Sequence, residues 1–335
     1  PSFNQLPLAQ IGAADLTLEE GYGNDADRAV LLLAMVRAAG FDPEFVLTSS
    51  WSPLLKRLRD PLVETPQRHL FNDILVRVPH ENGFVYLGDT DQYAALGSTP
   101  HDGRLGLTSR GVSTVEALPD HADRSEVDYT LTVDENGKTR LHVRRRYYGM
   151  DFASFHRRYA EMPPEERRRH YQELLGGISQ SAKAVSELTT DYNAYPGTRE
   201  FTADIDRYAV RTGTYLQLSL PGGLPELANL RADERSGPLY RSGPYRLAQT
   251  YRMVLPEQTD DVLMKPDDVA WTGPHGLGAV TIRTEREDAR TLTVESVVDL
   301  KSAVVDPLDY PALLNANRTF QHPETTTILL YLQKE

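Results

Sequence analysis

The stretch GNDADRAVLLLAMVRAAG, at residues 23–40, decides the fold of the first part of the chain. Asn24 and Asp25 offer side-chain oxygens that can cap a helix, and Asp27 places negative charge in its first turn. Gly40 supplies the stop at the other end. Because the run AVLLLAMV is apolar nearly all round, we expect this helix to lie inside a domain and not on its surface.

After this helix the sequence predicts a strand at Glu44–Thr48, a polar helix-like stretch at Trp51–Arg59 and then two further strands. Residues 72–78 alternate in hydrophobicity, the run HENG that ends at Gly83 is typical of a turn, and Phe84–Leu87 returns along the strand at 72–78. A helix followed by antiparallel strands is an α+β arrangement. We therefore expect a compact α+β domain at residues 1–105.

From residue 106 onward the sequence predicts a second, mostly β domain that extends to residue 335. Glu126–Val133 and Thr139–Tyr148 form a hairpin pattern, and the Asn-Gly pair between them favours a type I′ turn. A helical insertion is expected near residues 151–177. Many short strands with Gly/Pro turns are typical of a β-sandwich, and the remaining strand patterns lie at 182–188, 201–210, 213–220, 245–254, 279–285, 291–300 and 326–332.

The stretch at 23–40 resembles the core motif of transglutaminase-like (papain-like) proteins, in which a cysteine follows the glycine by two residues and precedes a leucine-rich helix. Asp25 stands here at the place of the catalytic cysteine. The histidine of that family sits early in a strand in a Phe-Asn-His context, and the sequence FND puts Asp73 at its place. The aspartate of the family, often followed by threonine, matches Asp89 in LGDT.

The resemblance implies a degenerate catalytic triad. In such a triad a thiolate attacks, an imidazole carries the proton and an aspartate orients the imidazole. With Asp25 and Asp73 at the first two positions, and no cysteine in the chain, thiol chemistry is excluded. We expect no cysteine-peptidase, amidase or transglutaminase activity, no catalytic residue and no cofactor. The expected function is that of a non-catalytic pseudoenzyme, a binding or scaffold module of the bacterial cell envelope.

Two interpretations of the three carboxylates remain open. In one, Asp25 caps its helix while Asp73 and Asp89 are solvated residues at strand ends. In the other, the three converge in a retained pocket on a ligand or a cation, which makes them a weak candidate site for Ca²⁺ or Mg²⁺. The second interpretation allows an alternative function, a hydrolase with carboxylate or metal-assisted chemistry. A third possibility is a structural envelope component without a pocket.

Composition limits the partners. The net charge of −12 argues against nucleic acid, and no run is long and apolar enough for a transmembrane helix. The basic runs Arg144–Arg146 and Arg167–Arg169 are expected on solvated faces. The nine histidines, His69 included, show no metal-ligand spacing, and we expect them to be surface or satisfied residues.

Peptides, glycans and envelope proteins remain as partners. The 17 tyrosines suit a glycan- or partner-binding surface, although tyrosine also simply pairs across strands. The resemblance implies a periplasmic or extracellular location. It also implies that the chain corresponds to the last two parts of multidomain bacterial proteins that begin with a further β-domain.

Overall fold

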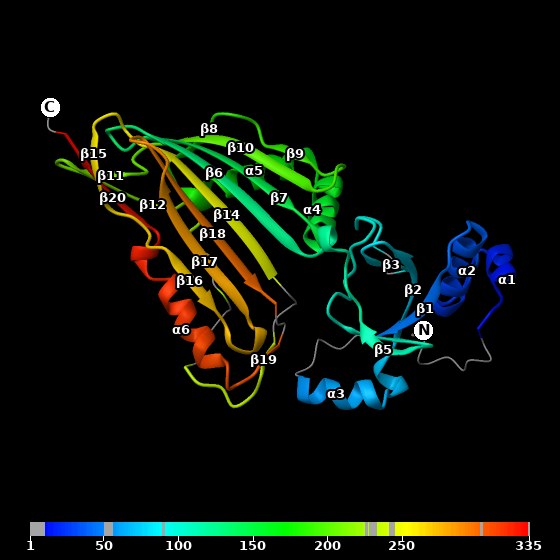
Figure 1. The fold of residues 1–335 in the computed structure, drawn as a ribbon. Helices are drawn as coiled ribbons and strands as arrows, with labels where there is room; N and C mark the ends of the chain where they lie inside the picture. The colour runs from blue at the N-terminus through cyan, green and yellow to red at the C-terminus, as the bar shows by residue number, and fades with distance from the viewer. Residues whose placement is uncertain are drawn as a thin grey trace. The chain divides into compact units, whose positions relative to one another are not determined.

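The computed structural model describes residues 11–49, 56–88, 91–224, 227, 233–240, 245–301 and 304–333. The fold is α+β, as the sequence predicted, with helices and several sheets (Figure 1). Contacts divide the chain into two compact units. In the described residues, no helix combines the length and the hydropathy that a membrane span needs.

The first unit comprises the described part of Pro1–Asp123, Tyr148–Ser154 and Tyr240–Pro244. Its five-stranded sheet has the order β3-β2-β1-β4-β5, and every pairing in it is antiparallel. The strands are β1 (Glu44–Thr48), β2 (Asp73–His80), β3 (Gly83–Leu87), β4 (Leu105–Thr108) and β5 (Gly111–Thr114). The helices are α1 (Ala14–Glu20), α2 (Asp25–Ala38), α3 (Lys56–Glu64) and the short turns Arg68–Leu70 and Pro119–His121.

The first unit extends past residue 105, where the sequence placed the domain boundary. Strand β4 begins at Leu105 and pairs with β1, with Leu47 opposite Leu107. Since β4 and β5 complete the first sheet, the chain does not leave this unit until Asp123. The expected boundary at residue 105 therefore coincides with the start of a strand of the first sheet.

Helix α2 lies at the predicted place, but it is less buried than its sequence suggested. Its buried residues are Ala26, Ala29 and Leu33, whereas Met35 is 58% exposed. The helix packs against α1 and β2, and its other apolar side chains stay partly accessible within the described residues. The apolar run and its caps predicted the helix correctly and its environment incorrectly.

The second unit comprises Arg124–Tyr147, Phe155–Leu239 and the described residues from Tyr245 onward. Its large sheet has the order β16-β17-β18-β14-β6-β7-β10-β8, with β9 also on β10, and its smaller sheet has the order β11-β12-β20-β15. The large sheet contains β6 (Arg124–Val133), β7 (Thr139–Tyr147), β8 (Ala182–Ala184), β9 (Thr189–Asp191), β10 (Gly197–Ile205), β14 (Tyr245–Val254), β16 (Val269–Thr272), β17 (Gly278–Arg286) and β18 (Thr291–Leu300). The other strands are β11 (Val210–Thr212), β12 (Tyr215–Ser219), β15 (Thr259–Met264), β20 (Thr327–Leu332) and the short β13 (Leu239–Tyr240) and β19 (Val304–Val305).

One hydrophobic core joins the two sheets of the second unit. Buried residues of the large sheet, such as Leu131, belong to the same cluster as Leu330 of the smaller sheet and Leu313 of α6 (Tyr310–Phe320). The short turns Pro274–Gly276 and Pro323–Thr325 are further helical elements of this part. Packing of two sheet faces on one core is the arrangement that the alternating strand patterns predicted.

The helical insertion consists of two helices, α4 (Gly149–Glu161) and α5 (Pro164–Ile178). The ring of Phe155 in α4 stacks on that of Tyr147 in β7, with centroids 4.3 Å apart. Tyr171 in α5 meets Phe201 in β10 edge-on at 5.6 Å. These contacts place both helices along one face of the β7–β10 region (Figure 1).

The hairpin of β6 and β7 is present, but its turn is not the type I′ turn that the sequence favoured. Asn136 does not have the positive φ that this turn needs, whereas Gly137 has a φ of 84°. The amide of Gly137 donates to the carbonyl of Asp134 at 3.1 Å, and that of Asp134 donates to the carbonyl of Lys138 at 3.0 Å. A longer loop with one left-handed glycine replaces the two-residue turn.

The first unit contains a carboxyl group that should make its stability depend on pH. Asp123 accepts a hydrogen bond from the amide of Met150 at 2.5 Å. Burial, aided by the charges of Asp151 and Asp102, raises the pKa of Asp123 from 3.8 to about 6, although the Met150 hydrogen bond opposes the rise. The folded state therefore favours the protonated acid more than the unfolded state does.

We expect this group to cost the folded state about 2 kcal/mol between about pH 4 and pH 7, after allowance for solvent screening. Below the pKa that Asp123 has in the unfolded chain, the folded state has its full stability. That stability is lost as the pH rises through the higher pKa of Asp123 in the folded state. Asp123→Asn should remove that loss, and urea unfolding at both ends of the range measures it. The exposed Asp42→Asn is the control, and equal pH slopes for Asp123→Asn and wild type would contradict the assignment.

Candidate functional site

A cleft of about 440 Å³ lies in the first unit between the first turn of α2 and the start of β2. Residues of four segments line it: Asp25, Arg28, Ala29 and Leu32 from α2, Asn72 to Leu75 around the start of β2, Gly88 after β3, and His101. The cleft thus brings together Asp25 and Asp73, two of the three positions that the resemblance singled out. They are 48 residues apart in the sequence, and the packing of α2 on β2 brings both to one cleft.

The cap of α2 leaves the Asp25 carboxylate outside the helix hydrogen bonds. Asn24 is the N-cap, since its side-chain oxygen accepts from the amides of Ala26 at 2.8 Å and Asp27 at 3.1 Å. The Asp27 carboxylate accepts hydrogen bonds from the amide of Asn24 at 3.0 Å and from the amide of Gly12 at 2.7 Å. This capping box corrects the interpretation of Asp25 as the cap. Asp25 is instead an exposed first-turn residue on the cleft wall, where the helix dipole favours its negative charge.

Asp73 is held by the antiparallel pairing of β1 and β2. It lies directly opposite Thr48, the last residue of β1. The amide of Asn72 donates to the carbonyl of Thr48 at 3.1 Å and continues the ladder by one residue. Asp73 is therefore the paired first residue of β2, half-buried on the wall of the cleft.

His101 is the cleft residue that the sequence did not predict. It is 8% exposed, and its Nδ1 lies 3.2 Å from the hydroxyl of Thr48. Burial lowers its pKa, the Arg104 charge lowers it further, and the Asp73 charge raises it. The imidazole is thus neutral near pH 7. No spacing along the chain links His101 to Asp25 or Asp73, so only the three-dimensional path could have identified it.

The other sequence-based site residues have different outcomes. Asp89 lies outside the described residues, and its neighbour Gly88 lines the cleft. His69 is exposed and belongs to the short turn Arg68–Leu70, not to an extended segment. Within the described ranges, no group of three or more histidine and acidic residues could hold a metal ion. Calcium or magnesium binding that includes Asp89 stays a prediction.

The cleft combines charges of both signs with a neutral base. Asp25 lines it from α2 and Asp73 from β2, and Arg28 adds a guanidinium. The Thr48 hydroxyl lies beside the His101 imidazole, as a nucleophile lies beside its base. Thr48 is 0% exposed, however, and cannot reach a substrate. The arrangement suits charge recognition, with His101 able to accept a proton from a bound group.

No protein-family model matches this chain, and no curated protein matches it. Among solved structures, the chain is similar to the crystal structure of a "putative protease" from Parabacteroides distasonis, with a TM-score of 0.48 and 12% sequence identity. The alignment covers 98% of this chain and 48% of that one. The chain thus spans about half the length of the protein that it matches.

Proposed function

We propose that this chain is a non-catalytic, transglutaminase-like module of the bacterial cell envelope that binds a peptide through the cleft between α2 and β2. The observation that carries the proposal is the shared cleft of Asp25 and Asp73. Both stand at positions where the resemblance places catalytic residues, and neither supplies a thiol or an imidazole. A pocket that keeps its walls without its nucleophile is suited to binding.

The charges of the cleft favour a ligand that carries an ammonium group beside a carboxylate. Asp25 and Asp73 can accept hydrogen bonds from a lysine-type ammonium, and Arg28 can pair with a peptide carboxylate. The neutral His101 adds a polar wall without adding charge. A short peptide with a lysyl side chain near its free carboxyl end fits this pattern.

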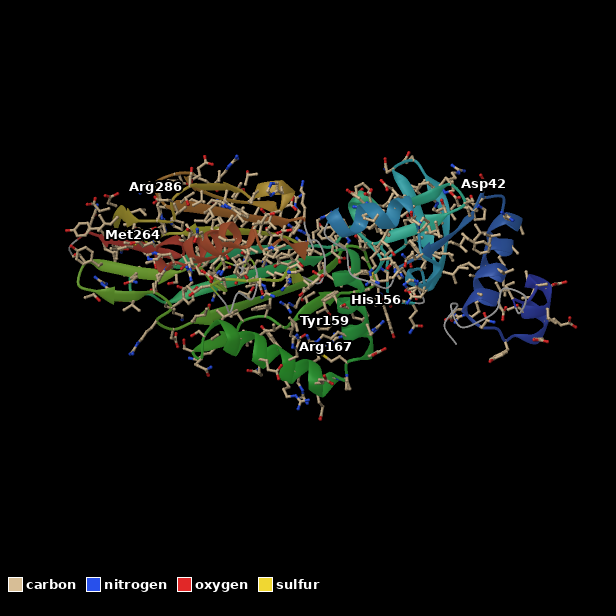
Figure 2. All side chains as sticks on the ribbon, turned by 90° about the horizontal axis from the view of Figure 1, so that it is seen from below. Asp42, His156, Tyr159, Arg167, Met264 and Arg286 are labelled. Carbon is tan, nitrogen blue, oxygen red and sulfur yellow. The ribbon has the colours of Figure 1, made fainter. Side chains whose placement is uncertain are left out.

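The test is calorimetric titration with two acetylated dipeptides, alanyl-lysine and alanyl-norleucine, which differ in the ammonium group. We expect the lysyl peptide to bind about tenfold or more tightly than the norleucyl peptide, because charge-assisted hydrogen bonds to two carboxylates are lost in the latter. Asp25→Asn and Asp73→Asn should each remove most of that preference. Asp42→Asn, which makes the same charge change on the loop after α2 (Figure 2), should leave it intact.

Equal affinities for the two peptides, or a preference that survives both cleft substitutions, would reject the proposal. The alternative function, a hydrolase, draws on one observation: His101 is a neutral base on the cleft wall. Cleavage of the lysyl peptide that is lost in His101→Asn and kept in Asp42→Asn would favour that alternative.

A further inference from the structure

The basic run Arg144–Arg146 divides between the two faces of β7. Successive side chains of a strand point to opposite faces, so Arg144 and Arg146 share one face and Arg145 takes the other. On the first face, Arg144 pairs with Glu200 at 3.8 Å, and Arg146 pairs with Glu126 at 2.9 Å. The solvated-face prediction is therefore correct for two of the three arginines.

Arg145 lies on the inner face, directly across from Arg199 of β10. The Nε atoms of both residues are buried and have no hydrogen-bond partner. Nη2 of Arg145 donates to the hydroxyl of Ser125 at 3.2 Å, and both guanidinium groups lie near the ring of Tyr147, at 4.9 and 5.9 Å from its centroid. In the described part of the chain, no ion pair joins either arginine to a carboxylate.

Further buried polar atoms without partners lie on β9 and on the helices α4 and α5. Thr190 of β9 lies opposite Arg199, and its hydroxyl is buried and unpaired. From the helices, the hydroxyl of Tyr159 and Nε2 of His170 are buried and unpaired as well, and their rings lie 5.9 Å apart. Arg167 covers the Tyr159 ring at 5.5 Å, and Figure 2 shows the two labelled side by side.

Positive charges from the helices and from the large sheet both act on His170 of α5. Burial lowers the pKa of His170, and the charges of Arg158 and Arg199 lower it further. Nη2 of Arg158 lies 3.3 Å from Nδ1 of the same imidazole. Glu173 lies 3.7 Å from that Nδ1 and is 65% exposed, and within the described residues it forms no ion pair with Arg145 or Arg199.

Two guanidinium groups on adjacent strands, with their Nε atoms away from water, repel one another and lose hydration. Proteins tolerate such a pair when a counter-charge satisfies it, and carboxylates do this for the outer arginines of the same strand. We propose that Arg145 and Arg199, with Tyr159 and Thr190, form a binding site for an oxyanion group, a phosphate or a carboxylate, between the large sheet and helices α4 and α5. Arginine recognises both groups through paired N–H donors.

The experiment is calorimetric titration of the full chain with inorganic phosphate and, separately, with acetate, in chloride buffer of constant ionic strength. We expect one of the two anions to bind with a stoichiometry of one and to raise the melting temperature. Arg145→Gln and Arg199→Gln should each weaken binding about tenfold or more, the loss expected for one charge-assisted hydrogen bond. The preferred anion identifies the ligand as a phosphate-bearing or a carboxylate-bearing molecule.

Arg144→Gln is the matched control, since it removes the same charge from the neighbouring residue on the outer face. It should leave binding and the melting shift unchanged. Tyr159→Phe removes only a hydroxyl and so tests the site without changing charge. Failure of both anions to bind the wild type, or equal binding by the Arg144→Gln, Arg145→Gln and Arg199→Gln variants, would overturn the proposal.

Discussion

Replacing Gly137 by alanine is expected to destabilise the protein by about 2–5 kcal/mol, through backbone strain and steric overlap together. Gly137 has a φ of 84°, a backbone angle that residues with a Cβ adopt only at a cost in free energy. A Cβ at this position would also overlap the carbonyl oxygen of Ala209. The two segments cannot simply separate, because the amide of Ala209 donates to the carbonyl of Gly137 at 3.0 Å.

Gly213→Ala separates the two contributions. Gly213 has a φ of 62°, yet a Cβ there would meet no atom within 4 Å. It should therefore cost only the backbone strain, about 1–2 kcal/mol. Urea unfolding of both variants measures the difference, and equal losses of stability would show that the contact between the β6–β7 loop and Ala209 is not rigid.

The strands could be predicted from the sequence because the alternation of apolar and polar residues is a local property. The patterns at 245–254 and 291–300 coincide with β14 and β18. The loop of the first hairpin was harder, since Asn-Gly favours one turn only when the loop has two residues. Here Val133 pairs with Thr139, which leaves five residues for the loop and selects another geometry.

Of the candidate site, only the residues within the short sequence motifs could be predicted. The positions of Asp25 and Asp73 followed from short motifs, and the cleft contains both. The role of Asn24 as the cap was open, because Asn and Asp are nearly equal in that role. His101 was missed because it comes from an irregular segment between β3 and β4, whose path depends on tertiary packing and not on any repeat in the sequence.

Strand pairing was the least predictable feature, and it brings a buried tyrosine onto a half-buried one. Strands β6 and β14 lie next to each other in parallel, although more than 100 residues separate them in the chain, and this pairing sets Tyr251 opposite Tyr129. Their rings stack with centroids 4.8 Å apart and an interplanar angle of 3°. These two tyrosines pair across strands, with Tyr251 in the core and Tyr129 packed against it.

Tyr251→Ala should accordingly cost about 3–5 kcal/mol, the range for deleting a large buried side chain, and lower the urea midpoint strongly. Tyr251 is 0% exposed, and its hydroxyl donates to the carbonyl of Gly223 at 3.0 Å. Tyr251→Phe should cost only about 1 kcal/mol, because it keeps the stacked ring and Gln249 still donates to that carbonyl at 3.4 Å.

Tyr215→Ala is the control for ring loss at an accessible site. Tyr215 is 46% exposed and meets the Tyr331 ring at 5.7 Å, so its removal should cost about 1 kcal/mol or less. If Tyr251→Ala and Tyr251→Phe unfold at the same urea concentration, the ring does not contribute to the core. The parallel contact of β6 with β14 would then not be the tightly packed centre of the large sheet, because the free energy of a packed ring must appear in the difference between those two variants.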